Sequence, residues 1–140
     1  MQLKFKVLEN GTLPTRAHRT DVGFDLYLPK DFIQFESGMS AFIKLRVCVE
    51  IPKDHVGFIM GRSSLNKKGI VCLTGVIDSG YTGEIATTLM NMSPNHYVFF
   101  KGERIAQLVV AKLADIDDAV SVDKLDDTER GAGGFGSTGA

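Results

Sequence analysis

The sequence predicts an all-β fold, either a sandwich or a barrel of short strands. Through most of the chain apolar residues alternate with polar ones, which is the two-residue period of a half-buried strand. Turn signals rich in Gly, Pro, Ser, Asn and Asp separate these runs at short intervals, a spacing typical of sandwiches and barrels. The 140 residues suffice for one domain whose core needs no disulfide or metal.

The expected strands follow one another along the chain. The first, 3–7, alternates apolar residues with lysines, and the clearest, 43–51, ends before a proline. The other strand-like stretches are 24–28, 56–60, 85–90, 97–100 and 104–113. The sequence has one helical signal, residues 64–68, followed by Gly69, the residue type that most often ends a helix.

The C-terminal part of the chain differs in composition from the rest. Residues 115–129 include seven acidic residues, which indicates a solvated edge or a linker. The last ten residues hold five of the fifteen glycines and one aromatic residue, so they cannot pack a core and should order only on a ligand, if at all. We therefore expect a β-domain over 1–129, with a tether at 115–129, and a flexible glycine-rich arm at 130–140.

Composition argues against several classes of function. Sixteen Lys and Arg against seventeen Asp and Glu leave a net charge of −1, without the overall basic footprint of a nucleic-acid-binding protein. No apolar run approaches the ~20 residues of a membrane helix, and residues 1–10 lack the apolar core of a signal peptide. Two separated cysteines and three scattered histidines form no zinc pattern. We expect a cytoplasmic protein, or a nuclear or host-cell one if the source is eukaryotic or viral.

The glycine-rich arm is the first candidate for phosphate binding. A G-x-G-x-x-G spacing begins at Gly131, but a dinucleotide fingerprint needs a strand before it and a helix after it, and only four residues follow. The chain also lacks the Gly-Lys-[Ser/Thr] of a Walker A loop. The arm instead offers backbone N–H groups together with Arg130, Ser137 and Thr138, which suit a polyphosphate.

A second candidate lies at the start of the predicted helix. Arg62, Ser63 and Ser64 follow a glycine there, so the backbone can approach a ligand and free N–H groups can bind an anion. Serine as a helix N-cap explains the same residues without a ligand. Both interpretations stay open on the sequence.

The third candidate is an acidic residue at a strand end. Asp78 follows Val-Ile where a hairpin is expected to turn, which would hold the carboxylate rigidly, although Asp is also common in turns. Tyr81 fits a packed aromatic residue at the rim. Asp25 lies in an alternating strand, where an outward acid needs no explanation. Gln107 falls on an otherwise apolar strand face, so its amide needs partners.

Taken in order, five segments resemble the five ordered motifs of the trimeric dUTP pyrophosphatases (dUTPases). The segments are 23–26 (GFDL), 61–65 (GRSSL), 75–83 (GVIDSGYTG), 102–108 (GERIAQL) and 130–139 (RGAGGFGSTG). Each is weak alone, but five in order at family spacing, over residues 20–140, are specific. The family usually has Ala, Tyr and Pro where this chain has Asp21, Phe24 and Gly61.

The resemblance implies both a fold and an activity. The fold would be a jelly-roll-like β-barrel with one short helix and a flexible C-terminal arm, assembled as a homotrimer with three shared active sites. The activity would be hydrolysis of dUTP to dUMP and pyrophosphate with Mg²⁺ as cofactor, which limits uracil incorporation into DNA and supplies dUMP for dTMP synthesis.

The resemblance also implies roles for individual residues. Asp78 would activate the attacking water, Tyr81 would lie under the sugar and exclude a 2′-OH, and Asp25 would bind Mg²⁺ through water. The uracil edge would be read by the backbone of a β-hairpin at Leu73, Thr74, Gly75 and Val76. The phosphates would be held by Arg62, Ser63, Ser64 and Gln107. The closing arm would contribute Arg130 on the γ-phosphate, Phe135 over the uracil, and Gly136, Ser137 and Thr138.

These residue types match the chemistry that the reaction requires. Hydrolysis between the α- and β-phosphates needs an in-line water, a base that orients it, and cations for the leaving pyrophosphate. Magnesium keeps most of its waters, so one outer-sphere carboxylate is enough. Uracil and cytosine present opposite donors and acceptors at N3 and C4, so backbone groups alone can distinguish them.

Two other functions remain as alternatives. The dCTP deaminase branch of the fold resembles this chain in its Arg-Ser-Ser and Ile-Asp segments, but deamination needs a carboxylate near the ring, and Thr88 stands where that family has Glu. A non-catalytic regulatory jelly-roll protein should have lost at least one of Asp78, Arg130 and Phe135, and all three are present.

Overall fold

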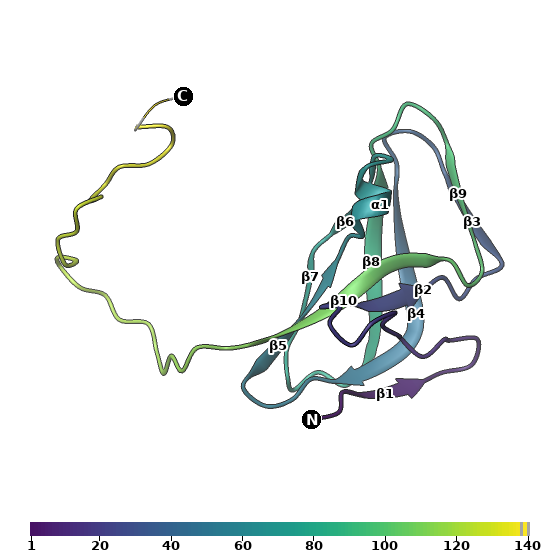
Figure 1. Cartoon of the computed structure of the whole chain (residues 1–140), viewed down its shortest axis with the longest axis horizontal. Coiled ribbons are helices and arrows are strands. Elements are labelled where there is room, and N and C mark those ends of the chain that lie inside the picture. Colours follow the sequence, from purple (N-terminus) through teal and green to yellow (C-terminus); the bar gives the residue numbers. More distant parts are fainter. Residues whose placement is uncertain (138, 140) are drawn as a thin grey trace.

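The computed structural model describes residues 1–137 and 139, and that part of the chain is almost entirely β (Figure 1). The first sheet has the strand order β1-β4-β8-β6 and the second sheet β2-β10-β5-β7. Both are antiparallel, and a two-stranded ribbon pairs β3 with β9. One short helix, α1, occurs in the described part. The predicted all-β, jelly-roll-like fold is confirmed.

The elements follow the predicted order closely. Their bounds are β1 (Lys4–Val7), β2 (Phe24–Tyr27), β3 (Phe32–Phe35), β4 (Ser40–Glu50), β5 (His55–Met60), α1 (Ser63–Asn66), β6 (Ile70–Leu73), β7 (Gly75–Ile77), β8 (Glu84–Asn91), β9 (Tyr97–Phe100) and β10 (Arg104–Lys112).

A single apolar core forms where the inner faces of the strands meet. In β4, Ile43, Leu45, Val47 and Val49 are buried, whereas the residues between them are partly or fully exposed. The hydrophobic effect explains this arrangement, because one face of each alternating strand leaves water. Strands β2, β8 and β10 contribute further core side chains, among them Leu26, Leu89, Ile105 and Leu108, and Leu28 joins them just after β2.

Two predictions about strands are wrong. The first is the set of expected strands, which omits β3, β6 and β7. In β3, Phe35 alone is buried. The second is the hairpin at Leu73–Val76. Leu73 ends β6 in the first sheet and Gly75 begins β7 in the second, so the chain changes sheets at Thr74. Alternation identifies a strand but does not say which strand it pairs with.

The helix begins one residue earlier than predicted. Its N-cap is Arg62, and no side chain caps it, so the interpretation of the serines as N-caps is wrong. The buried Leu65 anchors α1 to the core. Gly69 has φ +81°, the left-handed conformation expected of a residue just past a helix end.

After β10 the chain leaves the barrel and extends away from it (Figure 1). Among the described residues that follow Lys112, none belongs to a helix or strand, and most are exposed. Exposed apolar side chains occur here, including Ile116, Val120 and Leu125, each about four-fifths exposed. In the described chain, no helix has the length and apolarity that crossing a membrane requires.

Candidate active site

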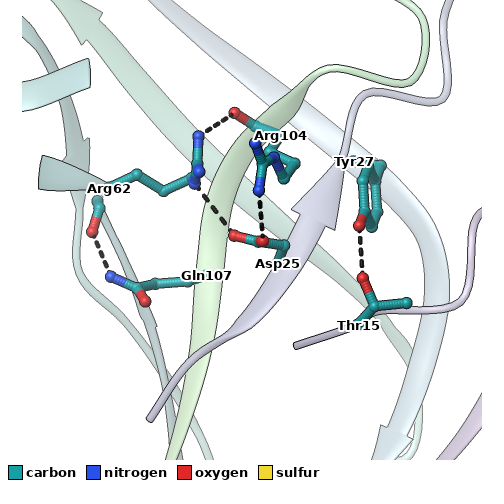
Figure 2. Close-up of polar contacts among 7 residues, drawn as sticks. Thr15, Asp25, Tyr27, Arg62, Arg104 and Gln107 are labelled. Carbon is teal, nitrogen blue, oxygen red and sulfur yellow. Dashed lines mark hydrogen bonds and ion pairs between the residues drawn. The ribbon is translucent and has the colours of Figure 1, made fainter. Parts of the chain in front are cut away.

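The first group of candidate residues centres on the Asp25 carboxylate (Figure 2). Arg62 donates from Nε to Oδ1 at 3.0 Å, and Arg104 donates from Nη1 to Oδ2 at 3.3 Å. Arg62 also donates from Nη1 to the Arg104 carbonyl at 3.3 Å. The Asp25 side chain is only 17% exposed, so it is held between two guanidinium groups. Asp25 is therefore a paired, largely buried carboxylate and not simply an outward acid of an alternating strand.

Strand register places the Gln107 amide beside these charges. Gln107 of β10 pairs with Asp25 of β2 and with Met60 of β5. Its Nε2 donates to the Gly61 carbonyl at 2.8 Å, which supplies the partner that a part-buried amide requires. Gly23 leaves room for this side chain, because a Cβ there would lie 2.0 Å from Gln107 Oε1.

A cavity of about 330 Å³ opens over this group. Its polar lining combines donors for an anion, namely two guanidinium groups, two serine residues and an amide, with the carboxylates of Asp21 and Asp25. The lining residues are Ala17, Asp21, Val22, Gly23, Asp25, Arg62, Ser63, Ser64, Arg104 and Gln107. We call this group the phosphate pocket.

A second cavity, of about 310 Å³, lies between β7 and β8, which belong to different sheets. Its size is at the lower end of the range of small-molecule sites. The lining residues are Phe42, Ile59, Gly75, Val76, Ile77, Asp78, Tyr81, Glu84, Ile85 and Ala86. We call it the base pocket. It contains the predicted Gly75 and Val76, but Leu73 and Thr74 are not among its lining residues.

Two of the predicted site residues, Asp78 and Tyr81, line the base pocket. Asp78 directly follows β7 and is exposed. The Tyr81 N–H donates to the Asp78 carbonyl at 3.0 Å and closes the turn, and the Tyr81 hydroxyl donates to the Glu84 carbonyl at 2.8 Å. The turn therefore holds a solvent-accessible carboxylate and a fixed aromatic ring next to each other.

The arm residues form a third group, apart from both pockets. Arg130 donates from Nε to the Gly133 carbonyl at 2.8 Å, and Phe135 is fully exposed. Gly136 has φ +83°, and the Ser137 N–H donates to the Gly134 carbonyl at 3.1 Å. The predicted binding residue Thr138 lies outside the described residues.

The chain keeps the phosphate pocket and the base pocket apart, and their linings share no residue. Ile77, just before Asp78, pairs with Gly57 near the start of β5. Arg62 follows the other end of β5, five residues further along. At ~3.3 Å per extended residue, Gly57 and Arg62 are therefore roughly 16 Å apart along the chain.

Sequence reasoning missed Arg104 as a site residue. It begins β10 opposite Tyr27, and the register then shifts between Arg104 and Ala106. This register shift accompanies the contact of Arg104 with Asp25, and no pattern in the sequence shows the shift. The one available signal was the position of Arg104 two residues after the Gly102 turn.

The acidic residues of the site restrict how a metal ion could bind. Within the described residues, no group of three or more His, Cys, Asp or Glu side chains is placed to hold a metal. The phosphate pocket offers the Asp25 carboxylate, already shared by two arginines, and Asp21, whose Oδ2 accepts from the His18 N–H at 2.8 Å. This donor set fits a hydrated Mg²⁺ held through water, and does not fit an ion fully ligated by the chain.

Comparison with known proteins agrees with the geometry. A family model described as dUTPase matches residues 9–139. The deoxyuridine 5'-triphosphate nucleotidohydrolase of Saccharomyces cerevisiae is 38% identical over 131 residues, which is 93% of this chain and 88% of the yeast protein. The protein of that name from Paramecium bursaria Chlorella virus 1 is 39% identical and covers 96% of this chain and 94% of its own length.

Solved structures show the same relationship. A dUTPase of Staphylococcus bacteriophage 80alpha in complex with dUpNHpp superposes with a TM-score of 0.91 at 31% identity, and covers 99% of both chains. Family model, relatives and structures thus agree over nearly the whole length of the sequence. The chain belongs to the dUTPase family.

Proposed function

We propose that this protein hydrolyses dUTP to dUMP and pyrophosphate. The observation that carries the proposal is the base pocket, which combines exposed backbone, apolar walls and the Asp78 carboxylate at its mouth. Removal of dUTP limits uracil incorporation into DNA, and the product dUMP is the precursor of dTMP.

In the proposed reaction, Asp78 orients a water molecule and accepts its proton. The water oxygen forms a bond to the α-phosphorus, and the bond from that phosphorus to the bridging oxygen breaks, so pyrophosphate leaves with the electron pair. Arg62, Arg104 and the Gln107 amide bind the phosphates and neutralise the charge on the leaving group, with Ser63 and Ser64 beside them.

Selectivity for deoxyuridine is assigned to the base pocket. The backbone of Gly75 and Val76, which lines the pocket, reads the donor and acceptor pattern of the uracil edge. Leu73 and Thr74, at the sheet change before it, are assigned the same role. The Tyr81 ring lies under the sugar and leaves no space for a 2′-OH.

Asp25 is assigned to hold Mg²⁺ through water. When bound, the ion supplies positive charge that neutralises the phosphate oxygens. A variant dUTPase of phage phi11, 26% identical to this chain, has a structure described as coordinating a structural Mg(II) ion. In this chain, Arg62 and Arg104 keep the Asp25 carboxylate oriented toward the phosphate pocket.

We further propose that copies of the chain assemble as a homotrimer that shares its active sites. The separate linings of the two pockets support this, because a site assembled from two copies can bring the base pocket of one against the phosphate pocket of the other. The outer face of the first sheet also carries apolar residues close together. Phe42 and Leu73 flank Thr88 on neighbouring strands, and Met90 lies opposite Val71. Phe42 is 67% and Leu73 52% exposed, so this face suits a second copy.

The arm is assigned to close over the bound nucleotide. Arg130 would bind the γ-phosphate and Phe135 would cover the uracil, with Gly136, Ser137 and Thr138 adding backbone and hydroxyl groups. The exposed tether before the arm supports this role, because it extends beyond the barrel and can reach the site of a neighbouring copy (Figure 1).

An assay with two substrates tests the proposed function. We expect pyrophosphate release from dUTP in the presence of Mg²⁺, and no ammonia release from dCTP. Ammonia release from dCTP would instead identify a deaminase. Thr88, which stands where the deaminase branch has its carboxylate, is not among the residues that line the base pocket. Nucleotide binding without either product would identify a regulatory protein.

A further inference from the structure

An irregularity in β4 lies next to the base pocket. The pairing of β4 with β8 runs regularly from Ser40 to Lys44, which faces Ala86, and resumes with Cys48 opposite Glu84. Three residues of β4 therefore face the single residue between Glu84 and Ala86. Arg46, at the centre of this bulge, has φ +58°, a left-handed conformation that is rare outside glycine.

The Glu84 carboxylate satisfies the backbone of this bulge. Its Oε1 accepts from the Arg46 backbone N–H at 3.0 Å and lies 3.5 Å from the Arg46 guanidinium Nη1. The Arg46 carbonyl accepts from the Leu8 N–H at 2.9 Å. A bulged residue loses its ladder partner, so a charged acceptor for its N–H is a strong contact. The Glu84 side chain is only 19% exposed.

The backbone of the same glutamate fixes the aromatic ring of the base pocket. The Glu84 carbonyl accepts the Tyr81 hydroxyl at 2.8 Å. The ring lies across Gly83, where a Cβ would be 2.5 Å from the hydroxyl oxygen. Tyr81 is 48% exposed, so little other packing holds its ring, and its position depends on where Glu84 is held.

We propose that Glu84 is a positioning residue for sugar discrimination: its carboxylate is anchored to the β4 bulge, and its carbonyl thereby sets the position of the Tyr81 ring. The inference rests on the proposed function, since it assigns Tyr81 to the exclusion of a 2′-OH. Glu84 itself does not contact the reacting atoms.

The test compares kcat/KM for dUTP and UTP in matched variants. Glu84→Ala should lower the dUTP-to-UTP ratio by about three- to tenfold, the usual effect of one lost hydrogen bond, while inhibition by pyrophosphate stays unchanged. Glu84→Gln keeps an acceptor for the Arg46 N–H and should restore most of the ratio. Arg46→Gly keeps that N–H, suits the positive φ, and should retain the ratio. An equal loss in Arg46→Gly would contradict the bulge contact.

A double-mutant cycle separates positioning from a general loss of stability. Once Tyr81→Phe has removed the hydroxyl, adding Glu84→Ala should not change the ratio further. An equal additional loss in that background, or an unchanged ratio in folded Glu84→Ala, would overturn the proposal.

A further variant keeps the test independent of the bulge. If Glu84→Ala does not fold, Gly83→Ala can replace it, because the added Cβ would displace the Tyr81 hydroxyl. This variant should lower the dUTP-to-UTP ratio by a similar factor. An unchanged ratio in Gly83→Ala would overturn the proposal. Failure of the proposed function itself would be recognised separately, as absence of pyrophosphate release by the unmodified protein.

Discussion

Individual side chains of the site owe their properties to neighbours distant in sequence. The Asp25 carboxylate is balanced by Arg62, which precedes α1, and by Arg104, which begins β10. Two arginines that bind the same carboxylate lose much of their freedom to reorient. The phosphate pocket is therefore pre-organised before any ligand binds.

Asp78 is the residue on which turnover should depend most strongly. Asp78→Asn removes the base but little volume, so turnover should fall roughly 10²–10⁴-fold while dUpNHpp still binds. Steady-state kinetics and calorimetric titration measure the two effects. The matched control is Asp31→Asn, an exposed acid between β2 and β3, which should behave as the unmodified protein. A near-normal kcat in Asp78→Asn would show that another group is the base.

Cys72 should make the protein sensitive to alkaline pH. Burial raises the pKa of the Cys72 thiol above 9.0, and a hydrogen bond with Thr87 offsets part of that shift. Because the unfolded thiol ionises first, its contribution to stability is complete below pH 9 and declines as pH rises through the folded pKa. Cys72→Ser has no thiol to ionise in this pH range. Its free energy of unfolding should therefore fall less than that of the unmodified protein between about pH 8 and about pH 10. Equal losses in denaturant titrations would contradict this.

Among the elements, Gly23, just before β2, packs closely against the Gln107 side chain of β10. Gly23→Ala would place a Cβ against Gln107 Oε1 and displace the amide from the Gly61 carbonyl. We expect KM for dUTP to rise by about three- to tenfold, with a smaller change in kcat. Gly80→Ala is the matched control, because no atom lies within 4 Å of a Cβ there. An unchanged KM in Gly23→Ala would remove Gln107 from phosphate binding.

The arm should contribute to activity without contributing to stability. Deleting residues 130–140 should leave the melting temperature and oligomeric state unchanged and reduce kcat/KM for dUTP severely. Ordering such a segment costs on the order of 1–2 kcal/mol per residue, so only contacts with the nucleotide can hold it closed. Thermal melting, light scattering and kinetics decide the question. An unfolded truncation, or one with full kcat/KM, would refute a closing role.

Local patterns predicted the strands better than they predicted strand pairing. Alternation located β4 and β8 because each buries one face, whereas the short strands β3, β6 and β7 were missed. The expected hairpin at Leu73–Val76 failed because partner choice depends on the whole core. Likewise, the motif segments located Asp25, Arg62 and Gln107, but not the role of Arg104, which depends on a register shift.

For the whole molecule, we infer an active site that one chain does not complete. The base pocket and the phosphate pocket share no lining residue. The arm extends away from the barrel (Figure 1). The residues that we assign to the reaction therefore line separate cavities of one chain. Closed symmetric assembly is the common way in which identical chains bring such surfaces together.

Mixing two inactive variants tests this central claim most directly. Asp78→Asn lacks the base and Arg62→Ala lacks a phosphate ligand, so each alone should be nearly inactive toward dUTP. If the two groups act from different copies, subunits that reassort at random restore roughly a quarter of the sites, and mixing should recover activity to that extent. As the control, each variant is taken through the same mixing procedure by itself. If mixed, reassorted protein stays as inactive as either variant, then Asp78 and Arg62 act within one chain and the shared-site account is wrong.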